Sequence, residues 1–269
     1  MEPNWVSGIV CLYAATDIAV PGDTYMIAQY SPLARKLGTF ANLSTHEHSI
    51  LATLHARRKS YSSGQDMVQQ GQPDQSAYVL ADGWVCSYRL LASGSRQIVD
   101  FQIPGDFLGL RTMLCRTAAH SVEPLTDVKA SSVNASQLME VFAQNPRLGT
   151  AVLWAASRDD AMVVEHLVGI GRRNAVERTA HLLLELGARL TLVGLGTRAG
   201  YDCPLSQYLL ADALGLSSVH VNRVLRELRE EGLLTFRNGR VDLTNFNGLV
   251  ALADFDQDYL DHDGPMCRH

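Results

Sequence analysis

The sequence predicts an α+β protein in which an antiparallel β domain is followed by a long helix and a C-terminal winged helix-turn-helix. Between residues 61 and 133, short alternating apolar and polar runs recur about every ten residues, separated by turn residues. Residues 148–170 carry apolar side chains along one broad helical stripe. Residues 205–229 read as two short amphipathic helices on either side of Gly215-Leu216-Ser217. These patterns, in this order, define the fold class.

The length and composition favour two domains, and the charge favours selective binding over indiscriminate binding to nucleic acid. The chain has 269 residues, of which 46% are hydrophobic, and its net charge of −5 argues against indiscriminate binding to nucleic acid. Residues 172–240 nevertheless hold ten arginines and seven acidic residues, so basic charge gathers around the helix-turn-helix. No apolar run approaches the about 20 residues of a membrane span, and Glu2 stands where a signal peptide would be positive. We therefore expect a cytoplasmic protein with no membrane partner.

The first 54 residues contain a segment without periodicity and a segment with helical spacing. Residues 1–25 show no periodicity, and we hypothesise that translation starts at Met26 or that this segment is a flexible arm. Residues 33–54 have helical spacing, and the segment 44–47 resembles a capping box. The histidines of this region invite a metal interpretation, but two of them would lie on different helix faces, which favours surface positions: His46, His48 and His55.

The β region contains three clear strands, at residues 78–80, 84–90 and 97–101. Their spacing predicts an antiparallel sandwich or barrel. The turns that separate the alternating runs are Gly64-Gln65-Asp66, Gly71-Gln72-Pro73-Asp74, Asp82-Gly83, Ser93-Gly94-Ser95 and Pro104-Gly105-Asp106.

Helices follow the β region. A helix begins near residue 136, and Pro146 can open the next one at its first turn. The stripe of this long helix makes it a candidate for dimerisation, although packing against its own β domain is the alternative. We expect a hinge at Gly169-Ile170-Gly171, a helix at 174–190 and a glycine-rich loop at 193–202. The residues predicted for the dimer helix are Leu148, Val152, Ala155, Met162, Val163 and His166.

The helix-turn-helix has the side chains that reading DNA requires. Gly215 suits a helix end that needs positive φ, and Ser217 can cap the following helix. That helix offers hydroxyl, imidazole, amide and guanidinium groups on the face opposite its apolar side. Arginine can bond guanine bidentately, and asparagine can do the same to adenine. An ordinary helical hairpin with a solvated polar face is the alternative.

A wing follows the second helix. Residues 233–236 and 241–243 are strand-like, and Asn238-Gly239 between them predicts a type I′ hairpin. Arginines flank this turn, where they can reach phosphates or remain solvated. The residues predicted to contact DNA are Ser206, Gln207, Ser217, Ser218, Val219, His220, Asn222, Arg223, Arg226, Arg237 and Arg240.

From about residue 31 to 260 the chain resembles the Crp/Fnr superfamily of bacterial transcription regulators. The specific matches are the segments 104–109, 171–178, 211–217 and 219–223, and the V-H-V-N-R form of the last looks like an alphaproteobacterial subgroup. The resemblance implies a homodimer on a near-palindromic site, with RNA polymerase as a further partner. It also implies a cyclic-nucleotide-binding-like β-roll (a double-stranded β-helix). The expected domains are an extension (1–30), a β-roll sensor with flanking helices (31–143), a dimerisation helix and hinge (144–171), the winged helix-turn-helix (172–250) and a tail (251–269).

The resemblance places the guanine-reading arginine at Arg223, whereas Val219 replaces a glutamate found in many members. A valine cannot accept from cytosine, but it can touch a thymine methyl, so the half-site is expected to differ. The sensor departs from cyclic-nucleotide binders, because no glutamate follows Gly109 and His120-Ser121 replaces their Arg-Ser pair. We therefore predict no cofactor and an unidentified effector, not a cyclic nucleotide. The predicted effector pocket comprises Gly105, Asp106, Phe107, Leu108, Gly109, Leu110, Arg111, His120 and Ser121.

Other inputs remain open. The five cysteines are scattered without a C-x-x-C pair, so no zinc or iron–sulfur site has ligands at standard spacing: Cys11, Cys86, Cys115, Cys203 and Cys267. Reduced cytosolic thiols are the expected state. Thiol oxidation at Cys86, Cys115 or Cys203 is one alternative input, and control by protein level without a ligand is another. A haem sensor would have only Cys86, His120 or His166 as axial ligands.

Two further function classes compete with a DNA-binding regulator. A cupin-like metal-dependent enzyme would use the β domain, but no H-x-H follows Pro104-Gly105, and His120 is the single histidine of the β region. We therefore predict no enzymatic activity and no metal site. A modulator that heterodimerises without binding DNA is the other alternative, and the presence of Arg223 and a wing argues against it.

Overall fold

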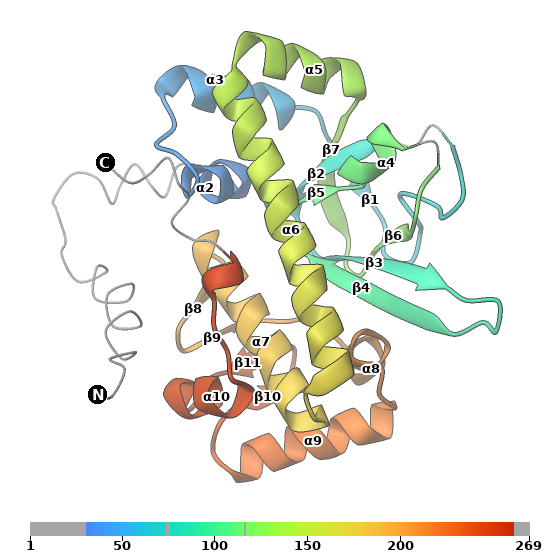
Figure 1. The fold of residues 1–269 in the computed structure, drawn as a ribbon, viewed down its shortest axis with the longest axis vertical. Coiled ribbons are helices and arrows are strands. Elements are labelled where there is room, and N and C mark those ends of the chain that lie inside the picture. Colours follow the sequence, from blue (N-terminus) through green and yellow to red (C-terminus); the bar gives the residue numbers. More distant parts are fainter. Residues whose placement is uncertain (1–30, 74–75, 116, 261–269) are drawn as a thin grey trace, which may run out of the picture. The chain divides into compact units, whose positions relative to one another are not determined.

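The computed structural model describes residues 31–73, 76–115 and 117–260 of the chain. The predicted extension at residues 1–30 and two of the five cysteines, Cys11 and Cys267, lie outside these ranges. In Figure 1 the β domain, the long helix and the C-terminal domain follow one another along the chain. The α+β fold class predicted from the sequence is confirmed.

The β-roll consists of two antiparallel sheets. One has the strand order β1-β7-β2-β5 and the other the order β4-β3-β6. Apolar side chains from both sheets, Leu80, Val85, Val122 and Ala130 among them, form a buried cluster inside the roll. The strands are β1 (Arg58–Tyr61), β2 (Ala77–Asp82), β3 (Val85–Leu90), β4 (Arg96–Gln102), β5 (Phe107–Leu108), β6 (Ser121–Pro124) and β7 (Val128–Val133).

Successive side chains of β3 point to opposite faces of the strand, so β3 contributes to two hydrophobic clusters. Val85 points into the roll, whereas its neighbour Cys86 belongs to a second cluster on the opposite face. The second cluster also contains Phe101 of β4, Leu183 of α7 (Ala175–Leu192) and Leu210 of α8 (Gln207–Leu214). The β-roll and the C-terminal domain therefore share one hydrophobic core.

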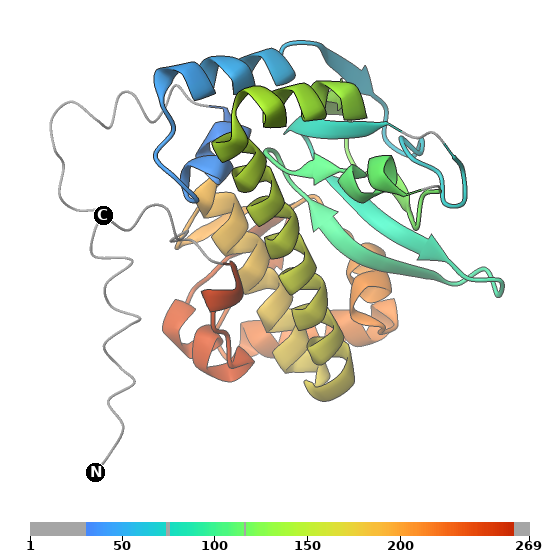
Figure 2. The ribbon, with the colours of Figure 1, turned by 45° about the horizontal axis from the view of Figure 1, so that its top comes forward.

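In the described part of the chain, helices α2 to α6 flank the β-roll or follow it in the sequence. Figures 1 and 2 show that α6 begins beside α5 and passes α7 in its later half, where His166 also contacts β4. Asn145 caps α6 by accepting from the Leu148 amide, and Pro146 occupies its first turn as predicted. The helices are α2 (Pro32–Gly38), α3 (Thr45–Leu54), α4 (Leu110–Leu114), α5 (Ala135–Gln144) and α6 (Pro146–Arg172).

The C-terminal domain starts at α7 and ends in a 3-10 turn. After α7 come β8 (Gly196–Thr197), β9 (Gly200–Asp202), α8, α9 (Ser218–Glu230), β10 (Thr235–Arg237), β11 (Arg240–Asp242), α10 (Phe246–Ala253) and the 3-10 turn η2 (Asp258–Leu260). The four strands form one sheet in the order β10-β11-β9-β8.

Three sequence predictions need correction. The helix expected over residues 33–54 is two helices, because Ser44 and Glu47 form a capping box that starts α3 afresh. The break expected at Gly169-Ile170-Gly171 is absent, since α6 continues to Arg172. The predicted loop at 193–202 contains the β8–β9 hairpin, whose second strand pairs with β11.

Candidate nucleic-acid interface and sensor site

The turn between α8 and α9 has the geometry that its sequence predicts. Gly215 ends α8 with a φ of 62°, a left-handed conformation that glycine adopts at little cost. Ser217 caps α9, because its Oγ accepts a hydrogen bond from the His220 amide at 3.2 Å. Ser206 caps α8 in the same way, accepting from the Leu209 amide at 3.2 Å. Both serines thus fix where the helices begin.

Helix α9 has two distinct faces. Val221, Val224, Leu225 and Leu228 are buried against the domain core. On the opposite face Asn222, Arg223 and Arg226 are exposed, and Val219 is 79% exposed. Ser218 and His220 are half-buried beside them, while Gln207 at the start of α8 is exposed. Tyr208 is 73% exposed on the same turn of α8 as Gln207. It was not among the residues predicted to contact DNA, although it directly follows Gln207 in the sequence.

The wing forms the predicted hairpin. Asn238 and Gly239 have φ values of 53° and 72°, as a type I′ turn requires. Arg237 is exposed, but Arg240 is paired: its Nη1 lies 3.0 Å from Asp202 Oδ1 and its Nε 2.8 Å from Asp242 Oδ1. Because two carboxylates already neutralise Arg240, Arg237 is the better placed of the two for a phosphate.

Asp106, one of the residues predicted for the effector pocket, is engaged by buried cations in this structure. Its Oδ1 lies 2.8 Å from Lys36 Nζ, and its Oδ2 accepts from Arg189 Nη2 at 2.9 Å and from the Ile103 amide at 2.9 Å. Burial opposes charge on Asp106, but Lys36 and Arg189 outweigh it and lower its pKa to about 2. The carboxylate therefore ties the β4–β5 turn to α2 and α7.

Gly105 serves the same junction. It has a φ of 97°, and a Cβ there would lie 2.8 Å from the carbonyl carbon and oxygen of Pro32. Only glycine allows α2 to approach this turn so closely. Phe107 and Leu108 are buried in the roll as β5.

The remaining predicted pocket residues differ in how far they are exposed to solvent. Gly109 begins α4 with a φ of 65°, Leu110 is half-buried and Arg111 is exposed. His120 is half-buried, and burial together with the charge of Arg111 lowers its pKa. Ser121 is buried, and its Oγ accepts from the Gln70 amide at 3.0 Å. Among the predicted pocket residues, all of which the structure describes, no arginine lies beside Ser121 in the sequence, where the cyclic-nucleotide binders have an Arg-Ser pair.

Four of the six residues predicted for the dimer helix take the alternative role given above, packing against their own chain. Leu148, Val152, Ala155 and Met162 are at most 2% exposed and pack within the chain itself. Val163 is 40% exposed, and His166 is engaged as described below. The most exposed apolar side chains of α6 are Leu153, at 66%, and Leu167, at 69%.

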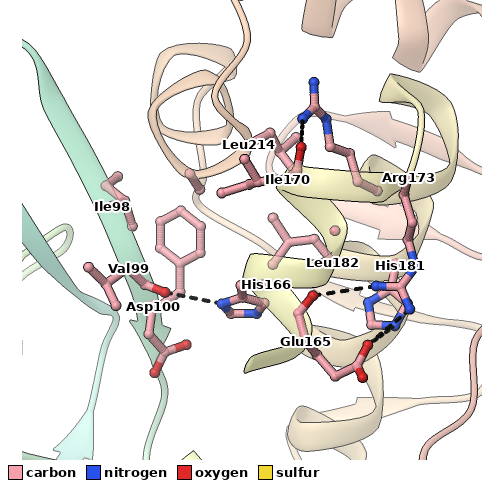
Figure 3. Close-up of a pocket in the computed structure, with 14 residues that line it drawn as sticks. Ile98, Val99, Asp100, Glu165, His166, Ile170, Arg173, His181, Leu182 and Leu214 are labelled. Atoms are coloured by element: carbon pink, nitrogen blue, oxygen red, sulfur yellow. Dashed lines mark hydrogen bonds and ion pairs between the residues drawn. The ribbon is translucent and has the colours of Figure 1, made fainter. Parts of the chain in front are cut away.

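A small cavity lies where β4, α6, α7 and α8 meet (Figure 3). It measures about 30 Å³ and is lined by Ile98, Phe101, Leu182 and Leu214 among others. His166 lies at its edge with both ring nitrogens engaged: Nδ1 is 3.1 Å from the Val99 carbonyl oxygen, and Nε2 is 3.0 Å from Glu185 Oε1. This leaves His166 no nitrogen for haem.

Two of the three thiols proposed as redox inputs are shielded. Cys86 and Cys203 are fully buried, and burial raises the pKa of each to about 12. Cys115 is exposed. Within the residues that the structure describes, no three His, Cys, Asp or Glu side chains converge as metal ligands. None of the described helices combines the length and apolar character needed to cross a bilayer.

Helix α9 is an exposed recognition helix beside a two-stranded wing, and the same chain carries a β-roll. This combination defines a DNA-binding regulator with a sensor domain. The Cyclic nucleotide-binding domain family matches residues 58–145, and the Crp-like helix-turn-helix domain family matches residues 177–252. The chain is 31% identical over 198 residues to the nitrogen fixation regulation protein FixK of Bradyrhizobium diazoefficiens, covering 73% of this chain and 82% of that one. It is 30% identical over 198 residues to FixK of Rhizobium meliloti, covering 72% and 86%.

Solved structures agree with this assignment. The structure of FixK2 from Bradyrhizobium japonicum matches with a TM-score of 0.66 and 27% identity, over 73% of this chain and 96% of that one. The chain belongs to the Crp/Fnr family of transcriptional regulators, with a cyclic-nucleotide-binding domain and a Crp-like helix-turn-helix. It is a DNA-binding regulator of this type.

Proposed function

We propose that this regulator acts as a cytoplasmic, non-enzymatic homodimer that places one α9 in the major groove of each half of a near-palindromic site. The observation that carries the proposal is the exposed face of α9, where Asn222, Arg223 and Arg226 stand opposite four buried apolar residues. Val219 contributes an apolar contact at the position where many relatives would accept from cytosine. Because of the V-H-V-N-R form of the helix, we expect the half-site sequence to differ from that of relatives with a glutamate at this position.

An unbiased selection from random DNA with the purified protein tests this proposal. Enrichment of a palindrome with one fixed spacing between half-sites is the expected result. Arg223→Ala should then cost about 1–3 kcal/mol at that site and relax selection at one G·C pair per half-site. Glu230→Ala, at the exposed far end of α9, is the matched control. If Arg223→Ala weakened all sequences equally, Arg223 would contact phosphate instead. No enrichment of any sequence would favour the heterodimerising modulator.

For the dimer we propose the exposed stripe of α6 in place of the predicted one. Positions 153, 157, 160, 164, 167 and 171 are all exposed, and their alternating spacing of four and three residues is that of a two-stranded coiled-coil seam. Leu153, Val164 and Leu167 are the apolar members, each at least 53% exposed. A second copy of α6 would bury these leucines and the valine.

We propose that the domain division expected from the sequence applies, with the sensor at 31–143 and the DNA-binding domain at 172–250. The sensor input is a small ligand other than a cyclic nucleotide, since Asp106 and His120-Ser121 offer no positively charged anchor for a cyclic phosphate. Activation would bring RNA polymerase as a further partner. Calorimetric titration with cyclic nucleotides should give no heat of binding, and saturable binding would contradict this assignment.

A further inference from the structure

Glu185 of α7 is the centre of a buried polar cluster. Its side chain is completely buried, and its Oε1 accepts from His166 Nε2 at 3.0 Å and faces Arg189 Nη1 at 3.4 Å. Its Oε2 accepts from the Tyr259 hydroxyl at 2.9 Å. A buried carboxylate needs all of these donors, because a lone charge out of water is costly. Helix α6, helix α7 and the C-terminal turn η2 thus meet at one side chain.

Tyr259 comes from a segment that the family match does not include. The match to the helix-turn-helix domain family ends at residue 252. The chain continues through residues 255–260, which we call the strap. Leu260 is fully buried, and Phe255 lies edge-on to His181 of α7 with 5.0 Å between ring centroids. The Tyr259 ring stacks on His181 at 5.9 Å. Figure 1 shows the short red turn η2 lying beside α6.

The strap connects two elements that the proposed function assigns to different tasks. Helix α6 carries the proposed dimer seam, and α7 is the first helix of the DNA-binding domain. The angle between them in each protomer sets the distance between the two copies of α9. Half-sites of a palindrome lie about 34 Å apart, one turn of DNA, so this angle has to be held.

The same cluster extends away from the strap into the β-roll. Arg189 Nη1 lies 3.0 Å from Asp100 Oδ1, and its Nη2 bonds to Asp106 Oδ2 at 2.9 Å. Asp106 in turn reaches Lys36 of α2. The strap therefore closes one end of a chain of ion pairs that runs from the sensor through α7 to α6.

We infer that the strap at 255–260, through the Tyr259 hydroxyl on Glu185, positions the DNA-binding domain on α6 so that both half-sites can be engaged together. Tyr259 and Glu185 are positioning residues, since neither lies on the exposed face of α9. This inference rests on the proposed function and adds a determinant of half-site spacing that lies outside the DNA-contacting surface.

The test compares Tyr259→Phe with Tyr61→Phe, a matched loss of one hydroxyl from a half-buried tyrosine of β1. Full-length proteins are titrated with the selected palindrome and with DNA in which one half-site has been scrambled. Tyr259→Phe should bind the palindrome about ten- to a hundredfold more weakly, as expected for loss of a hydrogen bond to a charged group. Its binding to the single half-site should not change, and repeated selection should return a broader range of spacings. Tyr61→Phe should match the unmodified protein in all three assays.

Two kinds of result overturn the inference, and they differ from failure of the proposed function. Equal losses on both DNAs would show a general destabilisation, and no loss on either would show that the hydroxyl is dispensable. A chain ending at Asp254, which lacks the whole strap, should lose at least as much palindrome binding as Tyr259→Phe; unchanged binding would also overturn the inference. If the unmodified protein binds no DNA sequence at all, the proposed function fails and this inference falls with it.

Discussion

The pair of His166 and Glu185 predicts a specific dependence of stability on pH. Burial disfavours a charge on His166, but the attraction of Glu185 and the hydrogen bonds to Glu185 and Val99 outweigh it and raise its pKa to about 9. An unfolded histidine titrates near pH 6.5. His166 therefore contributes stability that is complete below about pH 6.5 and is lost as pH rises through about 9.

The size of the effect follows from the two pKa values. A difference between about 6.5 and about 9 corresponds to about 3 kcal/mol, at about 1.4 kcal/mol for each pH unit. The window is well separated from other groups. Burial lowers the pKa of His55 and of His181 to about 4, so their contributions change below about pH 6.5, and the shielded thiols Cys86 and Cys203 act above about pH 9.

Urea unfolding between about pH 6.5 and 9, at one fixed protein concentration and followed by tryptophan fluorescence, measures this effect. The free energy of unfolding should fall by about 3 kcal/mol across the window. His166→Gln should start from a lower value and remain nearly flat. His46→Gln, at an exposed position of α3, is the matched control and should keep the slope. A flat profile in the unmodified protein, or an unchanged slope in His166→Gln, would refute the reasoning.

Three further predictions concern the exposed side of α6, the arginines of the wing and the packing of β9 against β11. Leu167→Asp should weaken dimerisation by about a hundredfold in sedimentation equilibrium, since two leucines each lose about 1.5 kcal/mol of burial, whereas Met139→Asp on exposed α5 should leave the dimer intact. Arg237→Ala should reduce the slope of DNA affinity against salt by about 1, and Arg240→Ala should change it less because Arg240 is already paired; equal slopes would contradict that ranking. Gly200→Ala should destabilise the protein by about 1–3 kcal/mol in thermal unfolding, because Gly200 has a φ of 151° and its new Cβ would collide with the Val241 carbonyl oxygen.

Local signals in the sequence were enough for the DNA-binding motif. Gly215, Ser217 and the Asn238-Gly239 turn act on their immediate neighbours, and each has the expected conformation. The paired strand β9 was missed because a two-stranded wing satisfies the same turn residues. Its pairing with β11 depends on residues about 40 positions away, which no local pattern reveals.

The contacts of the sensor residues and of α6 were hidden from the sequence for a different physical reason. Asp106 is held by Lys36 and Arg189, which lie 70 and 83 residues away in sequence. A Pro-Gly-Asp turn looks the same whether its carboxylate meets a ligand or two buried cations. Helix α6 is apolar on two faces, with Leu148 inward and Leu167 outward. Periodicity finds such a helix but cannot tell which face is covered by its own chain.

The role of Gly105 and Asp106 in joining α2, the β4–β5 turn and α7 bears on how genetic data for this regulator should be interpreted. A screen for loss of transcriptional control would recover substitutions at both positions, and their place in a motif shared with nucleotide-binding sensors would suggest effector-blind alleles. The contacts to Pro32, Lys36 and Arg189 indicate instead that such alleles uncouple the sensor from the DNA-binding half. Suppressors would then be found in α2 and α7.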